Sequence, residues 1–177
     1  MVDSRKVATA SVFGVIIAIV KGPLLPPPSG DLLVVVEAML LGLSFIILGI
    51  GGATYTAAVA GLLINFVEPG FYFYPFVLAL LYGLLVDGVS SVLKVKTAES
   101  VSSKRLAVSL TIATAVVGPV AYYATVYLTP ILPSDPSIYA TIIIVGVVSG
   151  AVGGILATRI WDRNLKARFK SVQPPVG

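Results

Sequence analysis

Residues 32–67 read LLVVVEAMLLGLSFIILGIGGATYTAAVAGLLINFV and contain one charged residue, Glu37. A helix that crosses the hydrocarbon core of a bilayer needs about 20 apolar residues, so this stretch suits two short spans better than one long span. Glycine permits a tight turn between two helices. The glycines near the centre of the stretch are Gly49, Gly51 and Gly52. The stretch therefore predicts two adjacent membrane helices, at residues 32–48 and 51–67.

The composition of the whole chain agrees with this interpretation. Of its 177 residues, 57% are hydrophobic and 11% are charged, whereas a soluble domain is about 45–50% apolar and about 25% charged. Polar and helix-breaking residues separate the apolar runs, which predicts an all-α integral membrane bundle of six transmembrane helices. We expect a single transmembrane domain that ends in a short basic tail at 162–177. The predicted helices cover residues 7–25, 32–48, 51–67, 72–93, 106–128 and 138–161.

The positive charges predict how the bundle is oriented. Six spans place both termini on one side, and of the 12 Lys and Arg residues only Lys21 falls on the other side. Because cytoplasmic loops are enriched in Lys and Arg, we expect both termini in the cytoplasm and a multi-pass protein of the plasma membrane, in contact with lipid. The cations thus need no nucleic-acid partner. Those on the terminal side are Arg5, Lys6, Lys94, Lys96, Lys104, Arg105, Arg159, Arg163, Lys166, Arg168 and Lys170.

The chain lacks the residues of common catalytic and metal sites. It has no Cys and no His, which excludes thiol nucleophiles, disulfides, imidazole bases and the usual zinc ligands. Asp87 is the only Asp predicted deep inside a span, so a pair of intramembrane aspartates is missing. We therefore expect no catalytic residue, no metal and no cofactor, and a protein that is not an enzyme.

Ionisable side chains inside a span are costly and are therefore candidate functional residues. Glu37 lies six residues after Asp31, which at about 1.5 Å per residue is roughly 9 Å inward from the outer end of its helix. It is the leading candidate for contact with a substrate. The alternative is a carboxylate that reaches water or a neighbouring hydroxyl group.

Acidic, amide and tyrosine side chains are concentrated on the outer side of the predicted bundle. Aromatic rings beside carboxylates can form a stacking wall for a flat, cationic organic ring. The alternative is a belt of aromatic residues at the membrane interface, which needs no ligand. Besides Glu37, the predicted substrate-binding residues are Asn65, Glu68, Tyr72, Tyr74, Tyr122, Tyr123, Tyr127 and Tyr139.

Asp87 differs from these acids because it lies in the cytoplasmic half of its span, directly before Gly88. We expect a structural role, either a pair with a basic residue or the cap of a helix that is broken at Gly88. Proton coupling is the alternative role.

Small residues recur at every fourth position of the first span, at Ala10, Gly14 and Ala18. Such a stripe forms a groove in which a second helix can approach closely. The second helix belongs either to this chain or to another subunit.

Together, the six spans, the cytoplasmic termini, the Ala10-x3-Gly14-x3-Ala18 stripe and the Pro-rich residues 22–30 resemble the S components of energy-coupling factor (ECF) vitamin transporters. S components are the substrate-binding membrane subunits of these transporters. The resemblance implies that the stripe docks a transmembrane coupling subunit and that residues 22–30 form a lid over the substrate. The missing His argues against the nickel and cobalt branch of the family.

The function that this resemblance implies is uptake of a small organic micronutrient. The micronutrient would be a vitamin or precursor, and a thiamine-like cation would match the acids and tyrosines. The chain has no Gly-x4-Gly-Lys phosphate loop, so partner ATPase subunits would supply the energy. The alternative is a non-catalytic accessory subunit of a larger membrane complex.

Overall fold

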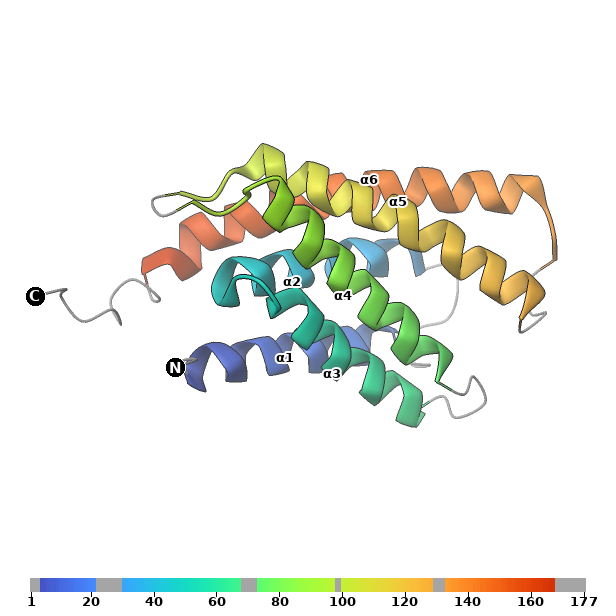
Figure 1. Cartoon of the computed structure of the whole chain (residues 1–177), viewed down its shortest axis with the longest axis horizontal. Helices are drawn as coiled ribbons and strands as arrows, with labels where there is room; N and C mark the ends of the chain where they lie inside the picture. The colour runs from blue at the N-terminus through green and yellow to red at the C-terminus, as the bar shows by residue number, and fades with distance from the viewer. Residues whose placement is uncertain (1–3, 22–29, 68–72, 98–99, 129–132, 168–177) are drawn as a thin grey trace, which may run out of the picture.

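The computed structural model describes residues 4–21, 30–67, 73–97, 100–128 and 133–167, and these form an all-α bundle of six helices (Figure 1). The predicted number and order of the helices are confirmed. Residues 22–25 of the first predicted helix, residue 72 of the fourth and residues 168–177 of the predicted tail lie outside the described ranges. The helices are α1 (Ser4–Lys21), α2 (Gly30–Leu48), α3 (Gly52–Val67), α4 (Tyr74–Val92), α5 (Ser103–Tyr127) and α6 (Pro136–Ile160), and the π-helical turn η2 (Trp161–Leu165) continues α6.

The bundle is long enough and apolar enough to belong in a membrane. Among the described helices, α4, α5 and α6 with η2 each meet the length and hydropathy of a membrane span. α2 and α3 are also apolar but shorter. With its 16 residues, α3 measures about 24 Å at about 1.5 Å per residue, less than a hydrocarbon core of about 30 Å. The chain is thus an all-α membrane protein that combines long and short apolar helices.

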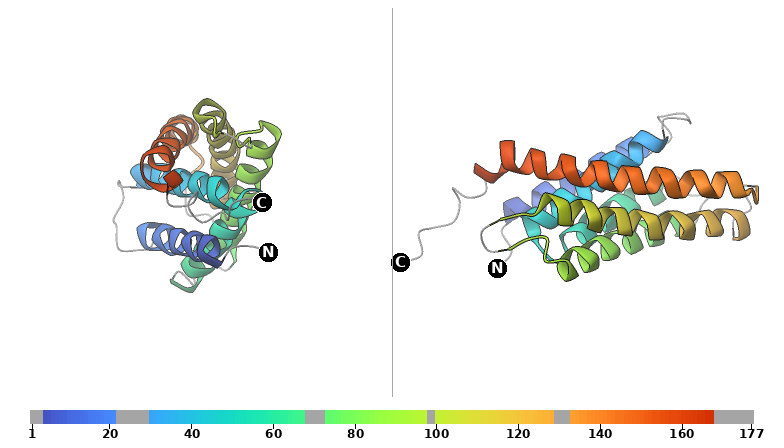
Figure 2. Two further views of the ribbon diagram at one scale, coloured as in Figure 1. Left: turned by 90° about the vertical axis from the view of Figure 1, so that its left-hand side faces the viewer. Right: turned by 90° about the horizontal axis from the view of Figure 1, so that it is seen from above.

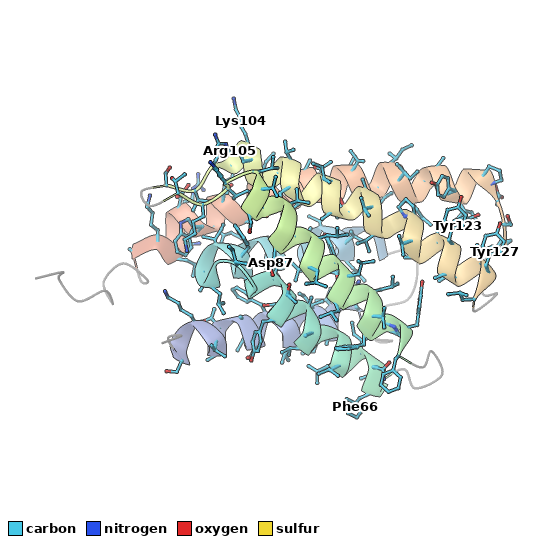
Figure 3. All side chains as sticks on the ribbon, in the orientation of Figure 1. Phe66, Asp87, Lys104, Arg105, Tyr123 and Tyr127 are labelled. Atoms are coloured by element: carbon cyan, nitrogen blue, oxygen red, sulfur yellow. The ribbon has the colours of Figure 1, made fainter. Side chains whose placement is uncertain are left out.

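The two ends of the bundle differ in charge (Figures 1 and 3). The start of α1, the turn between α2 and α3, the α4–α5 connection and η2 lie at one end, where Lys104 and Arg105 project outward. We call this the basic end. Tyr123 and Tyr127 lie at the other end, which we call the tyrosine end. The described cations thus separate along the bundle as the sequence predicts.

α2 occupies the centre of the bundle. It contacts α1, α3 and α6 extensively and touches α4 and α5 as well, and the end-on view in Figure 2 shows it between α1 and α6. A helix that is apolar on all sides is best buried on all sides. The side chains of Leu41, Leu43 and Ile46 are accordingly buried in the main hydrophobic core.

The turn between α2 and α3 forms where the sequence predicts it. Gly49 and Gly51 have φ angles of 84° and 89°, in the left-handed region that costs glycine little. At Gly52, an added Cβ atom would collide with the carbonyl oxygen of Ser44. Gly49 and Gly51 are therefore required for their backbone angles, and Gly52 is required for the close approach of α3 to α2.

The small-residue stripe of α1 faces the inside of the bundle. Ala10, Gly14 and Ala18 are buried, and a Cβ atom at Gly14 would lie 2.8 Å from the side chain of Val59 on α3. The hydroxyl of Thr56 on α3 also donates a hydrogen bond of 3.2 Å to the carbonyl oxygen of Ala10. The stripe thus packs against α3 of the same chain at Ala10 and Gly14, as the intramolecular alternative predicts, and docking of a coupling subunit stays a prediction.

Hydrogen bonds between helices supplement the apolar packing. The hydroxyls of Ser90 on α4 and Ser109 on α5 lie 2.7 Å apart, and both are buried. At the basic end, the ammonium group of Lys96 donates a hydrogen bond of 2.8 Å to the carbonyl oxygen of Ile46 in the last turn of α2. Partial burial lowers the pKa of Lys96, and the nearby positive charge of Lys6 lowers it further. A cation in this position complements the negative end of the α2 dipole.

Candidate functional site

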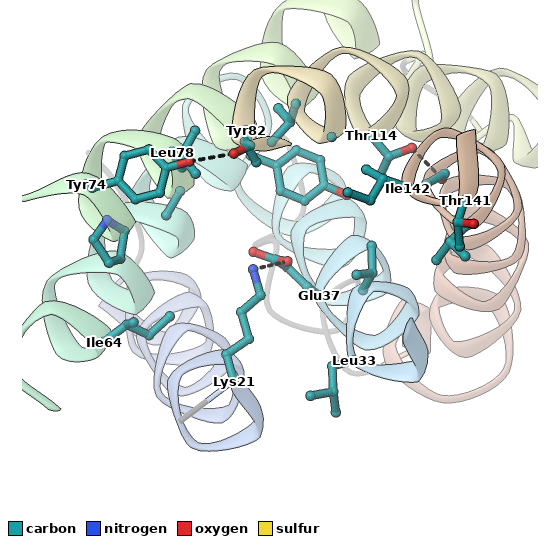
Figure 4. Close-up of a pocket in the computed structure, with 18 residues that line it drawn as sticks. Lys21, Leu33, Glu37, Ile64, Tyr74, Leu78, Tyr82, Thr114, Thr141 and Ile142 are labelled. Carbon is teal, nitrogen blue, oxygen red and sulfur yellow. Dashed lines mark hydrogen bonds and ion pairs between the residues drawn. The ribbon is translucent and has the colours of Figure 1, made fainter. Parts of the chain in front are cut away.

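All six helices line one cavity of about 550 Å³ in the half of the bundle near the tyrosine end (Figure 4). It lies between the end of α1, the first halves of α2, α4 and α6, the end of α3 and the second half of α5. Cavities of about 300–1,000 Å³ with mostly apolar walls and a few polar groups are typical sites for small organic ligands. The residues that line it are Lys21, Leu33, Val34, Glu37, Ile64, Tyr74, Pro75, Leu78, Ala79, Tyr82, Thr114, Val117, Gly118, Ala121, Thr141, Ile142, Val145 and Gly146.

An ion pair forms one wall of this cavity. The ammonium nitrogen of Lys21, the last residue of α1, lies 2.6 Å from a carboxylate oxygen of Glu37 on α2. The Glu37 side chain is only 7% exposed, whereas that of Lys21 is 36% exposed. The chain thus supplies a cation of its own to the acid that the sequence marks as the leading candidate for substrate contact.

The remaining polar groups of the wall differ in whether they are already hydrogen-bonded. The hydroxyl of Tyr74 donates to the carbonyl oxygen of Ala121 at 2.8 Å, and that of Thr114 donates to the carbonyl oxygen of Gly146 at 2.7 Å. The hydroxyl of Tyr82 is buried and has no hydrogen-bond partner within the described part of the chain. Figure 4 shows Tyr82 facing the same space as the Lys21–Glu37 pair.

Two of the predicted substrate-binding residues, Glu37 and Tyr74, line the cavity. Asn65 does not line it, although its side-chain oxygen is buried and has no hydrogen-bond partner within the described ranges. Glu68 and Tyr72 lie outside the described residues.

The other four predicted residues, Tyr122, Tyr123, Tyr127 and Tyr139, form a separate cluster between α5 and α6. The ring centroid of Tyr122 lies 5.9 Å from that of Tyr123 and 5.3 Å from that of Tyr139. The ring centroid of Tyr123 lies 5.9 Å from those of Tyr127 and Tyr139. None of the four lines the cavity. Tyr123 and Tyr127 are exposed, which fits the interfacial-belt alternative. These four tyrosines thus lie apart from the cavity that Glu37 lines, and their predicted part in substrate binding stays a prediction.

Hydrogen bonds join the tyrosine cluster to the start of α6. The Tyr122 hydroxyl donates to the carbonyl oxygen of Asp135 at 3.1 Å and accepts from its backbone N–H at 2.9 Å. Asp135 is the N-cap of α6, and its carboxylate accepts hydrogen bonds from the hydroxyl and the backbone N–H of Ser137. These bonds from Ser137 lower the pKa of Asp135. Tyr122 therefore has a structural function in joining α5 to α6.

Sequence reasoning missed Tyr82 and the part that Lys21 plays. Tyr82 lies in an apolar run in which nothing distinguishes it from its neighbours, so only the tertiary structure places it on the wall of the cavity. The ion pair of Lys21 could have been predicted, because Lys21 is the one cation on the outer side of the predicted bundle. A lone cation and a lone intramembrane acid on the same side are natural partners.

The described residues include no group of three or more His, Cys, Asp or Glu side chains that could hold a metal ion. Comparison of the chain with protein-family models, with curated proteins and with solved structures finds no match.

Proposed function

We propose that the chain is a membrane substrate-binding subunit for the uptake of a small organic micronutrient, a vitamin or a precursor of one. The observation that carries the proposal is the cavity of about 550 Å³ in one half of an apolar helix bundle. Its walls are mainly apolar, and its polar side chains are few and come from five different helices. That combination provides burial for an organic molecule together with groups that fix its orientation.

The separation of charge supports a direction for the uptake. With the basic end in the cytoplasm, both termini are cytoplasmic and the cavity lies in the outer half of the plasma membrane. The substrate would then be captured from outside, as the resemblance to S components implies. A transmembrane coupling subunit and ATPase subunits would drive its release on the inner side. Because α3 packs against the small-residue stripe at Ala10 and Gly14, docking of the coupling subunit on this stripe stays a prediction.

Filling the cavity tests the proposal. Val117 of α5 lines the cavity, so Val117→Trp is expected to weaken ligand binding at least tenfold by occupying the space. Val116 is the preceding residue, is 43% exposed and does not line the cavity, which makes Val116→Trp a matched control. Thermal shift and native mass spectrometry against a panel of vitamins and precursors measure binding to both variants and to the wild type.

Two results would contradict the proposal. One is equal binding by the two tryptophan variants, because the ligand would then lie elsewhere. The other is the absence of any bound compound together with stable co-purification of an unrelated membrane complex, which would favour the accessory-subunit alternative.

A further inference from the structure

The described charges on the wall of the cavity cancel. Lys21 and Glu37 are the only charged side chains among the described residues that line it, and they are paired at 2.6 Å. The rest of the wall consists of apolar side chains, glycine, hydroxyl groups and backbone. The described part of the wall therefore offers a ligand one positive and one negative group, which leave no net charge between them.

This balance determines which ligands can be buried at low cost. A ligand with a net charge would add an uncompensated charge to an apolar site, and one that captured Glu37 or Lys21 would leave the other partner alone. Glu37 is the more sensitive of the two, because its side chain is almost fully buried. A ligand without net charge avoids both costs. It either leaves the Lys21–Glu37 pair intact or binds both side chains at once, so that neither is left without a partner.

The hydroxyl of Tyr82 adds a directional requirement. It belongs to a side chain that is 3% exposed, and it lacks a hydrogen-bond partner in the described structure. Buried polar groups are nearly always hydrogen-bonded, because an unsatisfied one costs about 1–3 kcal/mol. A ligand that places a hydrogen-bond acceptor beside this hydroxyl would relieve that cost.

On the basis of the proposed function, we propose that the ligand of this cavity carries no net charge and presents a hydrogen-bond acceptor to Tyr82. This chemistry replaces the thiamine-like cation that Glu37 and the tyrosines suggest when the sequence is considered alone. The positive charge that pairs with Glu37 is supplied by Lys21 of the protein and not by the ligand.

Three probes of nearly equal size and shape test the charge preference: benzamide is uncharged, benzoate is an anion and benzamidinium is a cation. Saturation-transfer NMR titrations in detergent micelles would measure their binding to the wild type and to three variants. The wild type is expected to bind benzamide about tenfold more tightly than either ion. Lys21→Met should shift the preference to benzamidinium, and Glu37→Gln should shift it to benzoate.

The double variant Lys21→Met/Glu37→Gln is the matched control, because it removes both charges and should restore the preference for benzamide. Tyr82→Phe should weaken benzamide binding about tenfold, whereas the unfolding temperature of the ligand-free protein should stay the same or rise, because the unsatisfied hydroxyl is removed. A wild type that prefers a charged probe, or a preference that does not follow the substitutions, would overturn the inference and leave the proposed function standing. Failure of every probe to bind every variant would also overturn the inference, whereas the proposed function is tested separately by the panel of vitamins and precursors.

Discussion

Asp87→Ala is expected to lower the free energy of unfolding by about 2–4 kcal/mol, because the carboxylate of Asp87 caps the start of a neighbouring helix. Asp87 lies on α4 and accepts three hydrogen bonds from the first turn of α3. They come from the backbone N–H of Ala53 at 3.2 Å, the backbone N–H of Thr54 at 2.8 Å and the hydroxyl of Thr54 at 2.6 Å. The negative charge also complements the positive end of the α3 dipole.

The expected loss of stability is large because the N–H and hydroxyl groups that donate to Asp87 have few other acceptors within reach. The first N–H groups of a helix have no partner within that helix. The turn before α3 is Gly49-Ile50-Gly51, and none of these residues has a polar side chain to act as a cap. Asp87 is 5% exposed, so its removal leaves these donors in a buried site. Asp87 thus has a structural role, but neither of the two that the sequence suggests: among the described residues it pairs with no cation, and α4 continues unbroken through Gly88 while the carboxylate caps α3.

Unfolding in mixed detergent micelles with increasing dodecyl sulfate, followed by circular dichroism, measures this effect. Asp162→Ala is the control, because Asp162 is exposed and its only described ion pair, with Lys166, is long at 3.8 Å. That variant should stay within about 0.5 kcal/mol of the wild type. Asp87→Asn should fall between the two, since an amide oxygen can still accept a hydrogen bond.

A different pattern would point to the proton-coupling alternative. If Asp87→Asn stopped transport while Asp87→Ala and Asp162→Ala were equally stable, the cap would contribute little and the carboxyl group would act in transport.

Gly154→Ala is expected to destabilise the bundle by about 2–3 kcal/mol, because an added methyl group would collide with the backbone of α5. A Cβ atom at Gly154 would lie 2.5 Å from the Cα atom and 2.8 Å from the backbone nitrogen of Ala107. Backbone atoms cannot move away as the end of a flexible side chain can. The α5–α6 pair, the most extensive helix contact of the described bundle, would have to separate.

The control for this prediction is Gly88→Ala, for which the opposite sign is expected. Gly88 also lies inside a helix, but a Cβ atom there would meet nothing within 4 Å. Alanine lowers the conformational freedom of the unfolded chain, so this variant should be as stable as the wild type or more stable by about 0.5–1 kcal/mol. The same unfolding titration compares both variants. Equal destabilisation by both would show that close packing of α5 on α6 is not what the glycine provides.

The candidate site could be predicted only in part, because its residues carry unequal signals in the sequence. Glu37 stands out as a single acid in a long apolar run, and it lines the cavity. Tyr82 and Val117 resemble any other residues of an apolar helix, and their place in the cavity depends on how α4 and α5 are rotated in the bundle. The sequence predicts that the four clustered tyrosines lie at one end of the bundle, but the rotation of α5 and α6 decides whether they face the cavity.

The sequence by itself determined the number and order of the helices, the glycine turn between α2 and α3 and the separation of cations along the bundle. These features depend on the length of apolar runs and on the position of charges and glycines, which are local properties of the chain. Only the tertiary structure decided which partner each polar or small residue meets. Lys21 meets Glu37, Asp87 meets the start of α3 and Gly14 meets Val59 of α3. Each of these contacts joins different helices, so it depends on their packing and rotation, which runs of apolar residues do not specify.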